Sequence, residues 1–121
     1  MDVRKLFRSF RYAGKGFVQT VRAEQNFRFH LLSGAAVLFA GWLTGLSKAE
    51  WMIILLLIAG MLSLELVNTA VERVVDKASP EPHPLAGQAK DAAAAAVLVF
   101  ATSSAVIGFM IFLPKWWNLF N

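Results

Sequence analysis

Three long apolar stretches, separated by polar segments, dominate the pattern of the chain. Residues 31–47 and 51–64 carry no charge, and neither do residues 92–114. A bilayer core about 30 Å thick takes roughly 20 residues of helix. The third stretch is long enough by itself, whereas the first two need their flanking residues. The expected membrane-spanning helices are residues 30–47, 50–72 and 88–114.

The N-terminal segment has a different pattern, in which apolar and basic positions alternate at helical spacing. Its apolar positions are Leu6, Phe7, Phe10, Phe17, Val18, Val21 and Phe27, and its basic positions are Arg4, Arg8, Arg11, Lys15 and Arg22. This pattern predicts an amphipathic helix over residues 1–29 that lies on the membrane surface, with a hinge near the sequence AGKG at 13–16. Glu24 is the residue that simple anchoring to lipid does not explain.

Three prolines mark the connection between the second and third apolar stretches. Pro80, Pro82 and Pro84 each fix φ and disfavour helix in the preceding residue. We therefore expect a structured loop over residues 73–87, with the third helix beginning near Gly87 or Gln88.

Composition agrees with a membrane protein. The chain has 121 residues, of which 57% are apolar and 17% charged, and its mean hydropathy is +0.54, which is too hydrophobic for a soluble domain of this size. The fold class expected is an all-α membrane protein with a single domain over residues 1–121. The first thirty residues are basic and aromatic, unlike a cleaved signal. The absence of cysteine excludes disulfides, thiolate metal sites and a cysteine nucleophile.

Positive charge is concentrated on one side of the predicted spans. Of the twelve Lys and Arg residues, seven precede the first apolar stretch, three lie between the second and third, and only Lys48 and Lys115 lie elsewhere. The positive-inside rule then places the N-terminus and the 73–87 loop in the cytoplasm. Because this rule explains the clustering, the charge is no evidence for nucleic-acid binding.

Carboxylates interrupt the second apolar stretch on a single face. Glu65 and Glu72 are seven residues apart and differ by only about 20° in direction, with Asn68 between them. Charged groups in a span cost roughly 2.5 to 3.5 kcal/mol each even on lenient scales, so they usually face a bundle interior and serve a function. There are two alternative interpretations of this polar face. It could form polar contacts between helices, or it could line a small oligomeric channel or proton carrier. A channel lining should continue toward the outer face, but residues 51–62 are apolar.

These residues suit phosphoryl transfer at the inner membrane surface. Glu72 together with Glu24 is expected to bind Mg²⁺, which commonly takes one or two protein carboxylates plus substrate phosphates. Glu65, which lies deeper, is expected to accept a proton from a hydroxyl at the headgroup level. Lys90 is a candidate phosphate contact. No Walker A pattern is present, which excludes a P-loop kinase. His30 and His83 have no ligand spacing, so neither is expected to bind metal.

Two motifs, ELVNTAVERVVD at 65–76 and HPLAGQAKDAAAAAV at 83–97, resemble the signature of the small bacterial integral-membrane diacylglycerol kinases. RAEQNFRFH at 22–30 and the sequence at 50–70 look closer to the undecaprenol kinase branch of that family. The resemblance covers essentially the whole chain. It implies a homotrimer in the bacterial plasma membrane that transfers the γ-phosphate of ATP to a lipid hydroxyl with Mg²⁺.

The resemblance also implies roles for individual residues. Glu65 matches the proton acceptor of the family, Glu24 and Glu72 its metal ligands, and Asn68 its motif asparagine. The implied nucleotide contacts are Tyr12, Glu24, Glu72, Glu81, Pro82, His83, Lys90 and Asp91. Lys5 matches a basic contact near the N-terminus. Pro82 departs from the family pattern, because diacylglycerol-specific relatives carry Tyr there, and this departure fits the undecaprenol branch. The expected acceptor is undecaprenol, with diacylglycerol as the alternative.

Overall fold

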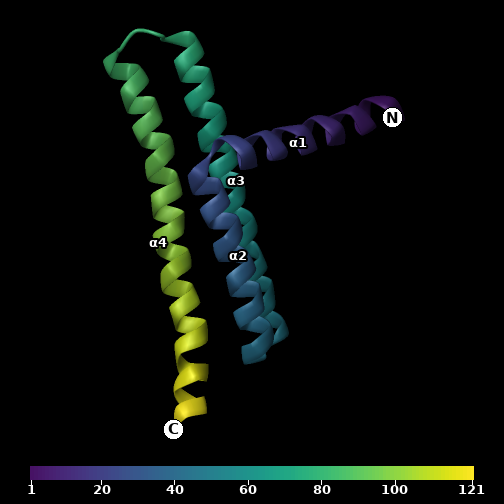
Figure 1. Ribbon diagram of the computed structural model, residues 1–121, viewed down its shortest axis with the longest axis vertical. Coiled ribbons are helices and arrows are strands. Elements are labelled where there is room, and N and C mark those ends of the chain that lie inside the picture. The colour runs from purple at the N-terminus through teal and green to yellow at the C-terminus, as the bar shows by residue number, and fades with distance from the viewer.

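The computed structural model describes all of residues 1–121 and consists of four helices without strands. Their bounds are α1 (Val3–Ala23), α2 (Gln25–Thr44), α3 (Lys48–Ala78) and α4 (Pro84–Phe120). Helices α2, α3 and α4 lie side by side, whereas α1 runs sideways out of this bundle (Figure 1). The three bundle helices are each long and apolar enough to cross a membrane. The prediction of an all-α protein with an N-terminal helix and three candidate spans is therefore confirmed.

Helix α1 is continuous, so the predicted hinge near residues 13–16 is wrong. Asp2 caps its beginning by accepting hydrogen bonds from the backbone N–H groups of Arg4 at 3.0 Å and Lys5 at 3.4 Å. Glycine costs a helix only up to about 1 kcal/mol per residue, which the surrounding helical segment tolerates. Both Gly14 and Gly16 accordingly keep negative φ angles.

The chain bends at a single residue, Glu24, which is extended at φ −112° and ψ 114°. Helix α2 begins at once, at Gln25, so the first span is part of a helix that starts earlier than residue 30. The Arg28 side chain fixes this bend, because its Nη1 donates to the carbonyl oxygens of Val21 at 2.8 Å and Arg22 at 3.0 Å. Fully buried Phe27 packs edge-on against Phe17 of α1. The bend therefore results from contacts between helices.

The opposite end of the bundle is held by polar contacts among all three bundle helices. Gly45 ends α2 in the left-handed region at φ 80°, and Ser47 and Glu50 form a capping box that begins α3. Lys115 of α4 pairs with Glu50 at 3.0 Å. Trp116 Nε1 donates to the hydroxyl of Thr44 at 3.0 Å. These contacts join α2, α3 and α4 near the C-terminus.

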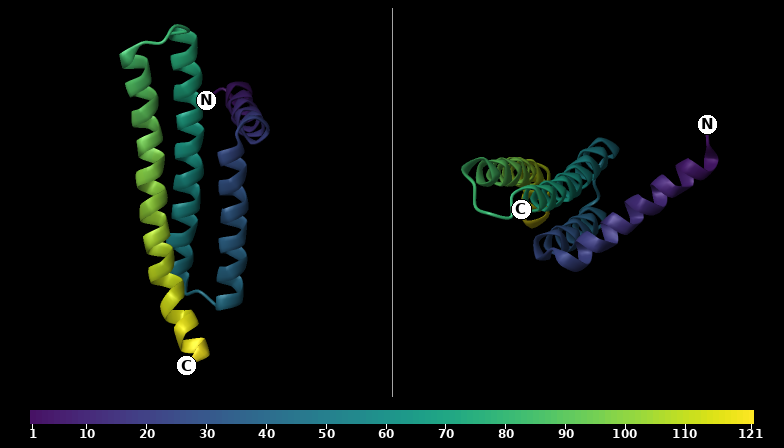
Figure 2. Two further views of the ribbon diagram at one scale, coloured as in Figure 1. Left: turned by 60° about the vertical axis from the view of Figure 1, so that its left-hand side comes forward. Right: turned by 90° about the horizontal axis from the view of Figure 1, so that it is seen from above.

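The connection between α3 and α4 is shorter than predicted. Helix α3 continues to Ala78 and α4 begins at Pro84, rather than near residue 87 or 88. Proline is suited to the first turn of a helix, where its missing N–H is not needed. His83 Nδ1 accepts a hydrogen bond from the Leu85 N–H at 3.1 Å and so caps the new helix. As a result, α3 and α4 extend past the level of α1 (Figures 1 and 2).

Helix α3 lies at the centre and packs against both α2 and α4 (Figure 2). The α3–α4 contact is close because Gly60 faces the ring of Phe100. Nearer the end of the bundle where α4 reaches the C-terminus, Ile54 of α3 packs with Ile111 and Phe112 of α4. Only 10 of 121 residues are buried, so most apolar side chains on the outer faces are left for lipid or for other copies of the chain.

Candidate active site

The polar stripe predicted on the second span faces inward from α3. Glu65 is 6% exposed and Thr69 is 4% exposed, so both are buried. Asn68 and Glu72 are half-buried on the same face, whereas Asp76 is exposed one turn farther on. Burying a carboxylate without a polar partner is energetically unfavourable, so the polar contacts of these residues indicate their function.

His30 of α2 is the polar partner of Glu65. Its Nε2 atom lies 3.2 Å from Glu65 Oε1, and the imidazole is largely buried. Sequence reasoning missed this contact, since it considered His30 only as a metal ligand. The available signal was an ionisable side chain at the beginning of an apolar span, which usually has a functional partner. The Glu65 carboxylate is therefore oriented from a second helix.

Asn68 orients the second carboxylate of the stripe. Its Nδ2 donates to Glu72 Oε1 at 3.4 Å, one helical turn farther along α3. The Oδ1 atom of Asn68 is buried and has no hydrogen-bond partner within the chain. A buried acceptor without a donor is unfavourable, so this oxygen is available to a cation or to a donor on a bound molecule.

Lys90 brings positive charge from α4 to the same region. Its Nζ lies 2.8 Å from Asp76 Oδ1, and Glu72 is close enough to attract the ammonium group as well. Asp91 is exposed beside it. Lys90 lies near the beginning of α4, the end at which the helix dipole favours anions. This end of the α3–α4 pair therefore combines carboxylates with a cation, as a nucleotide–metal site requires.

Glu24 is half-buried at the bend between α1 and α2, and its carboxylate forms no hydrogen bond or ion pair. No group of three or more His, Asp or Glu side chains is close enough to hold a metal ion by itself. Mg²⁺ usually keeps several waters and takes only one or two protein carboxylates. The free carboxylate of Glu24, the carboxylate of Glu72 and the unpartnered oxygen of Asn68 are donors of the type that this ion prefers.

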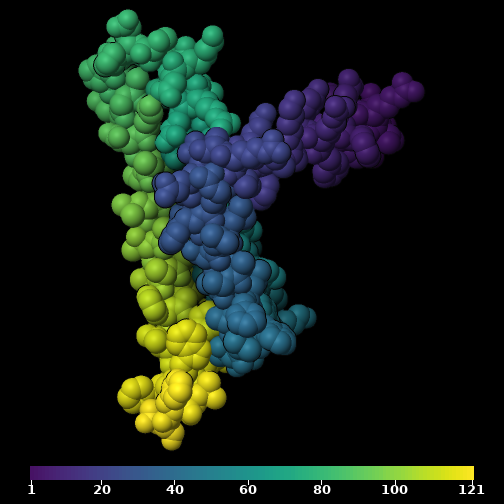
Figure 3. Space-filling view, viewed as in Figure 1, coloured from purple at the N-terminus to yellow at the C-terminus, as the bar shows by residue number.

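The other predicted contacts are exposed and are not joined to Glu65 within one chain. Lys5 and Tyr12 belong to the part of α1 that projects away from the bundle (Figures 1 and 3). Glu81, Pro82 and His83 form the exposed connection between α3 and α4. No hydrogen bond or ion pair links the side chains of these five residues to Glu65, Glu72 or Lys90.

Comparison with known proteins identifies relatives along the whole chain. The family model described as prokaryotic diacylglycerol kinase matches residues 11–112. An undecaprenol kinase of Bacillus subtilis (strain 168) is 55% identical over 114 residues, which covers 94% of this chain and 93% of that protein. A diacylglycerol kinase of Synechocystis is 39% identical over 88% of this chain and 61% of its own length. A diacylglycerol kinase of Escherichia coli (strain K12) is 34% identical over 97% and 93%.

Proposed function

Because this chain belongs to the prokaryotic diacylglycerol kinase family and is a lipid kinase of the membrane, we propose that its acceptor is undecaprenol and its product undecaprenyl phosphate. The observation that carries this proposal is the 55% identity to an undecaprenol kinase over almost the full length of both proteins. ATP supplies the phosphoryl group, as membership in a kinase family implies. The acceptor hydroxyl lies at the membrane surface, where the stripe of α3 ends.

Glu65 is proposed to accept the proton of the acceptor. The hydroxyl oxygen attacks the γ-phosphorus of ATP, the bond from that phosphorus to the β–γ bridging oxygen breaks, and ADP leaves. The hydroxyl proton passes to Glu65, whose carboxylate His30 holds in place at 3.2 Å. A positioned base in hydrogen-bond reach of the attacking group typically contributes about 10² to 10⁴ in rate. The 6% exposure of Glu65 supports this role, because water competes poorly with the acceptor there.

Glu24, Glu72 and Asn68 are proposed to hold Mg²⁺. When bound, this ion neutralises the negative charge of the transferring phosphates. Asn68 supports the set by holding the Glu72 carboxylate through its Nδ2 while its own Oδ1 is left free. The bend at Glu24 supports this role, because it leaves a free carboxylate between α1 and α2, on an element separate from α3.

The nucleotide is proposed to bind at the end of α3 and α4 that extends past α1. Lys90 contacts phosphate, Asp91 lies beside it, and the connection with Glu81, Pro82 and His83 closes over the nucleotide. Lys5 and Tyr12 contribute from α1. Both side chains are exposed, and α1 projects away from its own bundle (Figure 3), so they are proposed to reach the site of a neighbouring copy.

The working form is proposed to be a homotrimer in the bacterial plasma membrane with the N-terminus in the cytoplasm. The large apolar surface left on the bundle supports assembly, because only 10 of 121 residues are buried within one chain. The basic residues of α1 lie toward the same end of the molecule as Arg73 and Lys77 of α3 and Lys90 of α4, which supports a cytoplasmic placement of that end.

Purified protein in lipid nanodiscs, incubated with ATP labelled in the γ-phosphate, tests the acceptor. We expect label to pass to undecaprenol at least about tenfold faster than to diacylglycerol, a difference of about 1.4 kcal/mol between the two transition states. Thin-layer chromatography separates the two products. Faster labelling of diacylglycerol would assign the activity named for the Synechocystis and Escherichia coli relatives instead. Family membership argues against the channel hypothesis, and so does the apolar surface of α3 from Trp51 to Leu62.

A further inference from the structure

An apolar groove of about 480 Å³ runs between α2 and α4, with α3 as its floor. Twelve of the 17 residues that line it are hydrophobic. Its lining on α2 and α4 includes small residues, among them Ala36, Ala40, Ala101, Ala105 and Gly108. These side chains are small, and α2 and α4 contact each other at few positions, so space is left between the two helices.

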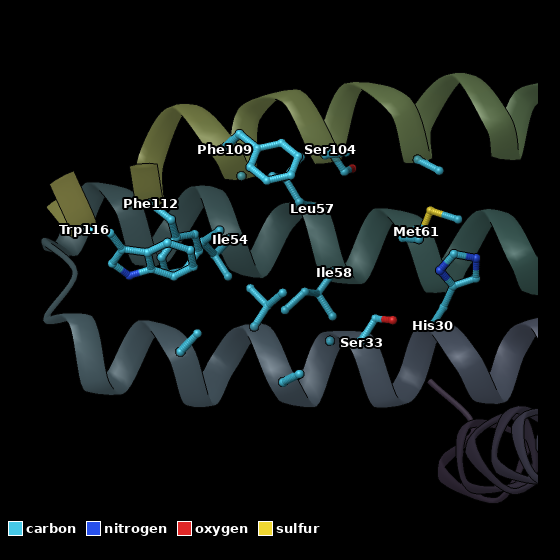
Figure 4. A pocket seen from close by; sticks show the side chains of 17 residues that line it. His30, Ser33, Ile54, Leu57, Ile58, Met61, Ser104, Phe109, Phe112 and Trp116 are labelled. Carbon is cyan, nitrogen blue, oxygen red and sulfur yellow. The ribbon is translucent and has the colours of Figure 1, made fainter. Parts of the chain in front are cut away.

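One end of this groove opens at the candidate active site. His30 lines the groove and also contacts Glu65 at 3.2 Å. In Figure 4 the imidazole and Trp116 lie at opposite ends of the cavity, with Leu57 and Ile58 between them. A molecule whose hydroxyl lies at Glu65 can therefore extend its apolar part directly into the groove.

Trp116 lies at the far end of the groove, and one side of the groove is open. Trp116 lines that end and is tied to Thr44 by a hydrogen bond of 3.0 Å, which links α4 to α2. Ala36 and Ala105 line the cavity and are exposed, and Phe109 is 60% exposed. A lipid can therefore enter from the side. Once inside, it lies along the bundle axis with its polar end toward Glu65.

The size of the groove fits a single chain. A cavity of roughly 150 Å³ takes one benzene molecule, which is about 25 Å³ for each carbon atom. At that density the groove takes about 20 carbon atoms, or about four isoprene units. Diacylglycerol would have to leave one of its two chains outside, whereas a prenol has only one chain to place.

We propose that this groove binds the first isoprene units of the acceptor alcohol and thereby selects a single-chain prenol over a two-chain glycerolipid. This inference rests on the proposed lipid kinase function and adds the site that recognises the hydrocarbon. Binding in the groove orients the hydroxyl toward Glu65, because His30, the one ionisable residue in the lining, lies at that end and contacts Glu65.

A photoreactive prenol tests the groove without requiring phosphoryl transfer. The probe carries a diazirine about four isoprene units from its hydroxyl, the length that the cavity volume accommodates. Protein in nanodiscs is irradiated with it, and labelled residues are identified by mass spectrometry. We expect label on groove residues near Phe112 and Trp116, loss of that label with excess undecaprenol, and no loss with dioleoylglycerol.

Two substitutions on α4 supply a matched pair. A Cβ added at Gly108 meets no atom within 4 Å, so Gly108→Phe places its ring in the open groove. Val106→Phe adds a similar ring at an exposed position outside the groove. We expect Gly108→Phe to remove the deep label and to raise KM for undecaprenol about tenfold, because buried apolar contacts are lost, and Val106→Phe to change neither.

Several results would overturn the proposal. Label that undecaprenol does not displace, or that falls on outward-facing residues only, would show that the groove does not bind the chain. Cross-links between two copies through groove residues would show that a neighbouring helix fills it. If dioleoylglycerol displaced the label as well as undecaprenol does, the groove would not select a single-chain prenol over a two-chain glycerolipid. Specific labelling in a protein that transfers no phosphate to any lipid would instead contradict the proposed function and leave the groove as a prenol site.

Discussion

At the scale of single residues, the two carboxylates of α3 differ in burial and in their polar partners. Glu65 is buried against His30, whereas Glu72, seven residues and about 10 Å farther along the axis, is half-buried and hydrogen-bonded to Asn68. The two carboxylates therefore cannot act on the same atom. The deeper one is suited to an alcohol that arrives from the bilayer, and the shallower one to a nucleotide that arrives from water.

Replacing Glu65 by Gln tests the deeper role. The amide keeps the size of the side chain but cannot accept the hydroxyl proton, so we expect kcat to fall by about 10² to 10⁴ while nucleotide binding persists. Radiolabel transfer and equilibrium binding of a nonhydrolysable nucleotide measure the two quantities. The matched control is Glu50→Gln near the other end of α3, where the carboxylate pairs with Lys115 and the expected kcat is unchanged. Retained turnover in Glu65→Gln would remove it as the base.

Replacing Glu72 by Gln tests the shallower role. Losing a carboxylate ligand weakens a hard-cation site, so we expect the Mg²⁺ concentration for half-maximal activity to rise by about tenfold or more. The measurement is a Mg²⁺ titration of the transfer rate at fixed ATP, and Glu24→Gln should behave in the same way. An unshifted titration in either variant would count against the Glu24–Glu72 pairing.

At the scale of elements, the position of α4 against α3 depends on one close contact. A Cβ at Gly60 would overlap the ring of Phe100, so the helices approach as they do only because this position lacks a side chain. The contact lies between Glu65 and the Ile54, Ile111 and Phe112 cluster. It therefore sets the distance at which Lys90 of α4 faces the stripe of α3.

Gly60→Ala should therefore destabilise the protein. Overpacking a tight contact typically costs about 1 to 3 kcal/mol, which exceeds the gain of up to about 1 kcal/mol in helix propensity. Gly108→Ala is the control, since a Cβ there meets nothing within 4 Å and only the propensity gain remains. Unfolding in mixed micelles on titration with dodecyl sulfate measures both. If both variants gained equal stability, the Gly60–Phe100 contact would not set the spacing.

At the scale of the whole molecule, α1 and the outer faces of the bundle are left largely uncovered by the rest of the chain. Helix α1, which carries the exposed Lys5 and Tyr12, projects away from the bundle (Figure 3), and the bundle keeps most of its apolar surface uncovered. Both facts are explained if α1 of one copy covers the carboxylates of the next around a closed ring.

Mixing two inactive variants tests this arrangement. In equal mixtures of Tyr12→Ala chains and Glu65→Gln chains, a shared site receives an intact Tyr12 from one copy and an intact Glu65 from the other about a quarter of the time. We therefore expect activity to recover to about a quarter of the native rate, measured after reassembly from a common micelle. Activity that stayed at the level of the separate variants would place each site within a single chain.

Much of the fold and of the candidate site can be predicted from the local pattern of apolar and polar residues. The apolar stretches predict three spans because the length of an apolar helix is set by the bilayer alone. The spacing of Glu65, Asn68 and Glu72 predicts their common face because helical geometry is regular, and the structure places that face inward. Helix boundaries were harder to predict from the sequence. Residues 73–78 continue α3, and α4 already begins at Pro84, because proline is favourable at the first position of a helix.

Contacts distant in the sequence were decided only by the tertiary structure. The bend at Glu24 depends on Arg28 bonding back to the end of α1 and on Phe27 packing against Phe17, and the sequence around it contains no glycine or proline to announce a break. The partnership of His30 with Glu65 and the groove that begins at His30 both require α2 and α4 to be placed on α3. Periodicity specifies which face a residue occupies, whereas the partner across that face is chosen by packing between helices.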